Sequence, residues 1–163
     1  MHSEDVKEWL SGYVGLMMEC EHQREQLLRM KSREILPPSF REPDGAQHTS
    51  AAGDRMAAAV VRRLDREPKI QAIIDRCEAE MQAMEEAVDA LPDPLERTVL
   101  RCRYFDGRVD PETGCHTWTR EKWRTVALSM YGSDEDRYIR TVERIHRLAL
   151  GHLSKNSVPF VGK

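Results

Sequence analysis

The sequence predicts an all-α protein in which a long antiparallel helical hairpin is followed by a C-terminal three-helix module. Three observations support this prediction. Apolar side chains recur at three- and four-residue spacings over most of the chain. Capping residues, prolines and glycines mark where those patterns begin and end. Of the 163 residues, 33% are charged and only 6% are aromatic, which favours solvated helices over a sheet sandwich.

The first helix is expected to run from Ser3, which can cap it, to about Glu34. Its apolar stripe alternates four- and three-residue spacings, with one polar lapse at Arg24. The stripe consists of Val6, Leu10, Tyr13, Met17, Cys20 and Leu27. The prolines and glycines of residues 37–53 end this helix and predict a loop.

A second helix is expected from near Asp54 to Ala90, with a heptad-like seam. The seam consists of Ile70, Ile73, Cys77, Met81, Met84, Val88 and Leu91. Pro68 lacks a backbone N–H and clashes with the preceding turn, so the helix should be kinked or split there. Two long helices with one apolar stripe each are expected to pair antiparallel. Because Met and Cys fill such a seam incompletely, a homodimer through these N-terminal helices fits the sequence as well as a monomer does.

The C-terminal module is expected to begin with Asp93 as a helix cap and Pro94 as the first helical residue, where the missing N–H of proline costs nothing. This helix should end near Tyr104, before a polar loop over residues 106–117. A second helix is expected after a cap region at residues 117–119. Its apolar positions at helical spacing are Trp123, Val126, Ala127 and Met130.

Gly132 supplies the backbone freedom for a tight turn after that second helix. Ser133 and Asp136 match an S-x-x-D cap for a third helix over residues 134–153. Its apolar face, expected to pack on the two preceding helices, consists of Ile139, Val142, Ile145, His146, Ala149 and Leu153. A short helix, a tight turn with glycine and a longer helix are typical of the helix-turn-helix motif. The chain thus divides into an arm over residues 1–91, a module over 92–153 and a tail over 154–163.

The opposite face of the third helix predicts a DNA interface. This face carries Arg137, Tyr138, Arg140, Thr141 and Arg144. Arg137, Arg140 and Thr141 are candidates for base contacts, because a recognition helix places its N-terminal turns in the major groove and arginine on guanine is the commonest specific contact. Candidates for phosphate contacts on the preceding helix are Arg120, Lys122 and Arg124. The alternative interpretation is an ordinary solvated helix face.

Three groups of residues in this part of the chain follow the pattern of a known family. They are Leu91-Pro92, Leu95-Glu96-Arg97, Val99-Leu100, Arg103-Tyr104 and Gly107; Trp123 to Ala127 with Met130 to Ser133; and Arg147 to Leu150 with Leu153. The pattern resembles region 4 of sigma-70-type transcription factors, and the whole chain resembles small phage and prophage transcription regulators of the ArpU and RinA type. The resemblance implies double-stranded DNA as a partner and RNA polymerase as a possible second partner. The loop over residues 106–117 is longer than in that family.

Charge is divided unevenly along the chain. Residues 1–92 contain 12 Lys and Arg against 18 Asp and Glu, whereas residues 93–163 contain 13 against 10. The basic excess of the C-terminal part favours a polyanionic partner. Three carboxylates at Asp134, Glu135 and Asp136 would repel phosphates, however, and they favour an alternative: a sigma-like adaptor that binds RNA polymerase or another protein without touching DNA. A further alternative is the small subunit of a phage terminase.

Several other classes are not expected. The chain has no nucleophile elbow, no glycine-rich phosphate loop and no H-E-x-x-H motif, so an enzyme is not predicted. The four cysteines have no C-x-x-C pair and are interpreted as reduced thiols of a cytoplasmic protein; no cofactor is expected. Cys102, Cys115 and His116 have the wrong spacing for a zinc site. No apolar run approaches the length of a membrane span, and no signal peptide is visible.

Overall fold

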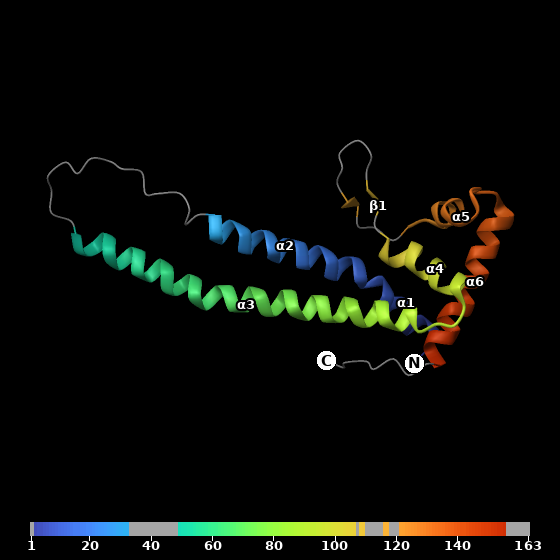
Figure 1. Ribbon diagram of the computed structural model, residues 1–163, viewed down its shortest axis with the longest axis horizontal. Coiled ribbons are helices and arrows are strands. Elements are labelled where there is room, and N and C mark those ends of the chain that lie inside the picture. Colours follow the sequence, from blue (N-terminus) through green and yellow to red (C-terminus); the bar gives the residue numbers. More distant parts are fainter. Residues whose placement is uncertain (1, 33–48, 107, 110–115, 118–120, 156–163) are drawn as a thin grey trace. The chain divides into compact units, whose positions relative to one another are not determined.

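The computed structural model describes residues 2–32, 49–106, 108–109, 116–117 and 121–155 (Figure 1). The elements are α1 (Ser3–Ser11), α2 (Tyr13–Ser32), α3 (Thr49–Asp89), α4 (Pro94–Leu100), the π-helical turn η1 (Arg101–Phe105), β1 (Arg108–Val109), β2 (His116–Thr117), α5 (Trp123–Tyr131) and α6 (Asp136–Lys155). The described residues are therefore mainly helical, which confirms the all-α prediction. The exception is the antiparallel pair β1–β2, in which Arg108 lies opposite Thr117 and Val109 opposite His116.

The chain forms two compact units. The first, unit 1, contains residues 1–18 and 79–163, and the second, unit 2, contains residues 19–78. The sequence-based division between residues 91 and 92 differs from this one and lies inside unit 1. The reason is that α1, the beginning of α2 and the end of α3 share a core with the C-terminal helices.

The larger core of unit 1 joins α1, the beginning of α2, the end of α3, α4, η1 and the C-terminal half of α6. Its buried side chains are Val6, Leu10, Tyr13, Met84, Val88, Leu91, Leu100, Tyr104, Phe105, Ala149, Leu150 and Leu153. The ring of Tyr13 lies 4.5 Å from that of Phe105, and its hydroxyl donates to the Glu85 carboxylate at 2.5 Å. Burial, and then this carboxylate, raise the pKa of Tyr13. Because Val6 and Leu10 of α1 share this core with the buried residues of α6, α1 contributes to the packing that holds α6 in place.

The start of the chain differs in two details from the prediction. The N-cap of α1 is His2 rather than Ser3, and the backbone N–H of His2 donates to the Asp5 carboxylate at 2.9 Å. The expected single helix is divided at Gly12, whose N–H is shared between the carbonyls of Glu8 and Trp9 at 3.2 and 3.0 Å. Glycine weakens a helix interior by about 1 kcal/mol relative to alanine, which explains why the break lies there.

Within unit 2, ion pairs join α2 and α3. They connect Glu19 with Arg76 at 4.0 Å, Arg24 with Glu78, and Lys31 with Glu67 at 3.6 Å. Among the side chains that the structure describes in this unit, the buried apolar ones are Cys20, Ile70, Ile74 and Cys77. Ile74 is 3% exposed, so Ile74 occupies the seam position that was predicted for Ile73.

One alternative for α3 is decided and one prediction needs correction. Pro68 lies inside α3, so of the predicted kink or split the split does not occur. The helix also begins at Thr49, so residues 49–53 are helical although they were predicted to belong to the loop; residues 37–48 lie outside the described part. Alanine, the best helix former, is frequent in residues 51–59, which explains how the helix extends back past Gly53.

Candidate nucleic-acid interface

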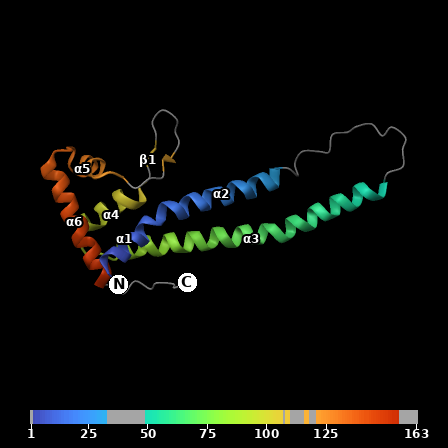
Figure 2. The same ribbon diagram turned by 180° about the vertical axis from the view of Figure 1, so that it is seen from behind.

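Helices α4, α5 and α6 surround a second apolar cluster of unit 1, and α5 lies beside the N-terminal end of α6 (Figures 1 and 2). Its buried members are Val99, Val126, Ala127, Val142 and Ile145. Because α5 and α6 both pack into this cluster, the helices before and after their connection are fixed relative to each other. The predicted apolar faces of these helices are confirmed. Leu150, which was not part of the predicted apolar face of α6, is also buried and packs in the larger core.

The connection from α5 to α6 depends on Gly132. Its φ is +68°, in the left-handed region, and its N–H donates to the Leu128 carbonyl at 2.9 Å to cap α5. Ser133 Oγ accepts from the N–H of Glu135 at 3.3 Å, and the Glu135 carbonyl accepts the first helical N–H bonds of α6. Ser133 therefore stabilises the turn, and α6 begins at Asp136, two residues later than the predicted start at 134 and extends to Lys155.

The N-terminal boundary of α5 was predicted wrongly. Thr117 belongs to strand β2, residues 118–120 lie outside the described part, and α5 begins at Trp123 with Lys122 as its N-cap. The start of α4 was predicted correctly: the Asp93 side chain accepts from the N–H of Leu95 at 2.8 Å, and Pro94 is the first helical residue. The two helix starts differ because Asp93-Pro94 is the one clear capping signal before α4, whereas the polar segment before α5 contains several possible capping residues.

The outward face of α6 carries a row of four exposed arginines, which we call the arginine row. Its members, at spacings of three, four and three, are Arg137, Arg140, Arg144 and Arg147. Three of them were candidates from the sequence. Arg147 was not predicted as a site residue, because the prediction rested on the N-terminal turns of the helix. Its three-residue spacing from Arg144 is the signal that places it on the same face.

The members of the arginine row differ in their contacts. The Arg137 Nε lies 3.0 Å from a Glu135 carboxylate oxygen, and its guanidinium stacks 4.5 Å above the ring of Tyr138. Tyr138 in turn stacks on Tyr131 at 5.1 Å, which links α6 to the end of α5. Arg140, Arg144 and Arg147 form no ion pair with any described residue. An external anion can therefore approach these three arginines without displacing such a pair.

The other predicted contact residues are partly occupied. Thr141 donates its hydroxyl to the Arg137 carbonyl at 2.8 Å. Arg124 is 72% exposed and lies 4.0 Å from an Asp134 carboxylate oxygen, while Lys122 is exposed. Arg120 lies outside the described residues. The carboxylates that precede α6 thus compensate two of the nearby cations.

Behind this surface lies a group of polar and aromatic side chains. His146 is 5% exposed, and its Nε2 lies 2.9 Å from the Tyr104 hydroxyl oxygen. The edge of the same imidazole meets Trp123 at 4.7 Å, and the Arg103 guanidinium lies 4.0 Å above the Trp123 ring. His146 therefore packs as a core histidine, as its place on the apolar stripe predicted.

No described helix combines the length and the apolar character that crossing a bilayer requires. Among the described residues, no three His, Cys, Asp or Glu side chains gather around a point where a metal ion could bind; Cys115 lies outside them. No protein-family model, curated protein or solved structure matches the chain. A function must therefore be inferred from the geometry of the surface itself.

Proposed function

We propose that this protein is a sequence-specific DNA-binding transcriptional regulator of the phage type. In this proposal α5, the Gly132 turn and α6 form a helix-turn-helix resembling sigma-70 region 4, and α6 lies in the major groove. The observation that carries the proposal is the exposure of Arg140 and Arg144 on the outward face of a helix whose inner face is buried. The N-terminal helices provide dimerisation or contacts with a partner.

Each of the predicted contact residues has a distinct role in this arrangement. Arg137 and Arg140 contact base edges from the first turns of α6, and Arg144 follows one turn later. Thr141 shares that face, and Tyr138 orients Arg137 through their stacking contact. Phosphate contacts come from Arg120, Lys122 and Arg124, which set the register of the protein on the duplex.

The carboxylates before α6 do not prevent this docking. DNA binding requires the pairs of Arg124 with Asp134 and Arg137 with Glu135 to open. Both pairs are exposed, so each contributes only about 0.2–1 kcal/mol. A bidentate arginine–guanine contact is worth about 1–3 kcal/mol, so the exchange favours the complex. The remaining carboxylate, Asp136, suits the positive end of the α6 dipole.

A second candidate is an adaptor that binds RNA polymerase or another protein without contacting DNA. The exposed carboxylates of Asp134, Glu135 and Asp136 favour this function, because an acidic first turn suits a basic protein surface better than a phosphate backbone. The two candidates predict opposite results in a DNA-binding assay.

The test is a binding-site selection with the full chain, followed by fluorescence anisotropy on the selected duplex and on a scrambled one. Arg140→Ala is expected to weaken binding to the selected duplex by about 1–3 kcal/mol and to reduce discrimination between the two duplexes. Arg76→Ala, which removes an equally charged exposed side chain from unit 2, should change neither value. Equal weakening on both duplexes would make Arg140 a phosphate contact.

Absence of selection, together with no binding at low salt, would contradict DNA binding. Recovery of RNA polymerase from a DNase-treated lysate would then support the adaptor. Helical circular dichroism of each variant should match that of the parent chain, because the substituted side chains are exposed.

A further inference from the structure

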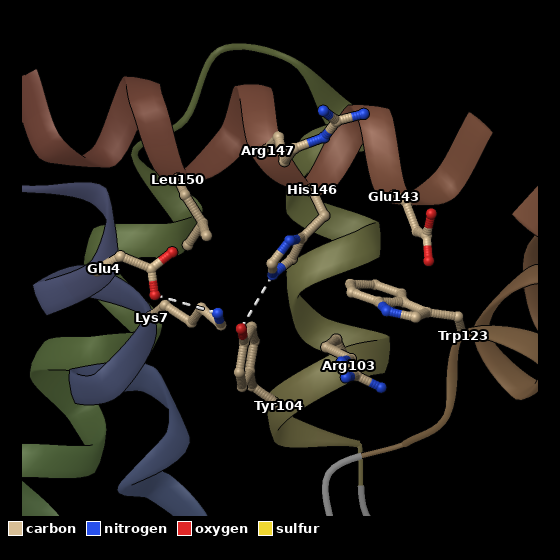
Figure 3. Close-up of a pocket in the computed structure, with 9 residues that line it drawn as sticks. All are labelled: Glu4, Lys7, Arg103, Tyr104, Trp123, Glu143, His146, Arg147 and Leu150. Atoms are coloured by element: carbon tan, nitrogen blue, oxygen red, sulfur yellow. Dashed lines mark hydrogen bonds and ion pairs between the residues drawn. The ribbon is translucent and has the colours of Figure 1, made fainter. Parts of the chain in front are cut away.

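Unit 1 contains a recess of about 580 Å³ that the proposed DNA-binding surface does not use. It lies between α1, η1, α5 and α6, and Figure 3 shows the side chains that surround it. Its volume falls within the range of about 300–1,000 Å³ that is usual for small-molecule sites. The lining residues are Glu4, Lys7, Arg103, Tyr104, Trp123, Glu143, His146, Arg147 and Leu150.

The recess combines aromatic rings with convergent polar groups. Trp123, Tyr104 and His146 supply the rings, and Tyr104 and His146 are joined by their 2.9 Å hydrogen bond. Figure 3 shows the Lys7 side chain extending from α1 toward this pair. Aromatic walls with a few placed polar groups are the usual composition of a site that orients a small molecule.

The charge of the lining favours an anion. The lining residues include three cations, Lys7, Arg103 and Arg147, and two carboxylates, Glu4 and Glu143. The Glu4 carboxylate lies 3.1 Å from the Lys7 ammonium, which retains further N–H donors. The Arg103 guanidinium is held in a fixed orientation by its stacking on Trp123 at 4.0 Å. A planar, oriented guanidinium is suited to paired hydrogen bonds with a carboxylate or phosphate.

A second feature of the backbone points to the same place. Arg103 and Tyr104 lie in η1, where the N–H of Asp106 donates to the Arg101 carbonyl at 2.9 Å, five residues back. A π-helical turn is rare, and such turns occur frequently at functional sites because they redirect side chains that a regular helix would place elsewhere. Here the irregular turn supplies both the guanidinium and the phenol of the recess.

From these observations we infer that the recess binds a small organic anion that carries a planar ring. The ring lies against the aromatic wall of Trp123 and Tyr104, and the anionic group accepts hydrogen bonds from Arg103 and Lys7. Arg147 belongs both to this lining and to the arginine row, but no other lining residue takes part in the proposed DNA contacts. Binding in the recess can therefore be tested separately from the proposed function.

The experiment is a titration of the full-length chain followed through the indole N–H resonance of Trp123, assigned with Trp123→Phe. The probes are AMP and salicylate, which place a phosphate or a carboxylate on a planar ring, with adenosine and inorganic phosphate as probes that lack one of the two features. We expect a saturable shift of the Trp123 resonance with AMP or salicylate. Which of the two binds identifies the anionic group.

The variants Arg103→Gln and Lys7→Ala should each raise the dissociation constant at least tenfold. Lys7 is half-exposed, so Lys7→Ala keeps the fold intact even if Arg103→Gln does not. Arg76→Ala removes an equal charge from unit 2 and should leave the dissociation constant unchanged. The inference is overturned if neither AMP nor salicylate shifts the resonance saturably, if Lys7→Ala binds like the parent, or if phosphate or adenosine alone binds as tightly as AMP.

Discussion

The thiol of Cys102 lies in η1, where burial, and then the neighbouring Asp106, raise its pKa to about 11. At pH 8 its thiolate fraction should therefore be roughly a hundredfold smaller than that of a thiol with the ordinary value of 9.0. We expect iodoacetamide to modify Cys102 slowly in the folded chain and rapidly in urea. Mass spectrometry of the labelled peptides measures both rates, and equal rates would contradict the predicted environment.

The same shift has a consequence for stability. A thiol whose pKa is raised by folding stabilises the native state fully below pH 9.0, and this contribution is lost as the pH rises through about 11. The melting temperature of the parent chain should therefore fall more steeply between these pH values than that of Cys102→Ala. Parallel curves for the two proteins would show that the thiol ionises equally in both states.

Asp93 provides a second prediction about a single residue. Its carboxylate accepts from the N–H of Leu95 at 2.8 Å and caps α4. Asp93→Ala should lower the free energy of unfolding by about 1 kcal/mol, whereas Asp93→Asn, which keeps an acceptor, should have a much smaller effect. Urea denaturation measures this difference, with Asp65→Ala on the exposed side of α3 as a control for loss of charge.

Residues whose chemistry permits one local structure were predictable from the sequence. Asp93 before Pro94 and the glycine at position 132 are such cases, since each satisfies a backbone requirement that few residue types meet. Ser3 and Ser133 were assigned as caps, but the cap of α1 lies at His2 and the hydroxyl of Ser133 bonds within a turn. Several polar residues stand near each of these helix starts, and the final choice depends on tertiary packing.

At the scale of the element, two glycines of the α5–α6 segment should respond oppositely to the same substitution. Gly132 has φ +68°, so Gly132→Ala should cost about 1–2 kcal/mol. Gly151 lies inside α6, and a Cβ added there would meet no other atom within 4 Å. Gly151→Ala should therefore stabilise the protein by up to about 1 kcal/mol. Thermal denaturation of both variants measures the pair. Changes of the same sign would contradict the assigned backbone conformations.

Periodicity predicted the elements well where one face is buried along its whole length. The face of α6 that carries Val142, Ala149 and Leu153 was identified from spacing alone. The seam of α3 was one residue out of phase at Ile74, because two adjacent isoleucines fit the pattern equally. The π-helical turn was not predicted, since the five-residue hydrogen bond of Asp106 leaves no signal in composition or spacing.

For the whole molecule, the candidate site was predictable in part. The arginines of α6 follow from the sequence because the apolar stripe fixes which face is outward. The packing that holds α6 in place could not be predicted from the sequence. The contacts of Val6 and Leu10 with the C-terminal helices join residues more than 80 positions apart. No local pattern contains such information, which is why the boundary between residues 91 and 92 differs from the observed division.

This division leads to a prediction about which segments fold together. A fragment of residues 92–163 lacks Val6, Leu10 and Val88, each 0% exposed in the core of unit 1. Burial of such side chains contributes about 1.5–3 kcal/mol each, so the fragment should lose most of its cooperative unfolding transition. By contrast, a chain in which a short Gly-Ser linker replaces residues 19–78 keeps every residue of that core and should retain a cooperative transition.

Circular dichroism and calorimetry of the two shortened chains distinguish these outcomes. The substitution Leu10→Ala in the full chain provides a quantitative companion, since it leaves a cavity in the shared core and should cost about 2–5 kcal/mol. Val60→Ala, at a side chain 48% exposed in unit 2, should cost far less. If the 92–163 fragment melted like the linker chain, the C-terminal helices would not need the N-terminal segment. Residues 92–163 alone would then be the DNA-binding or polymerase-binding module.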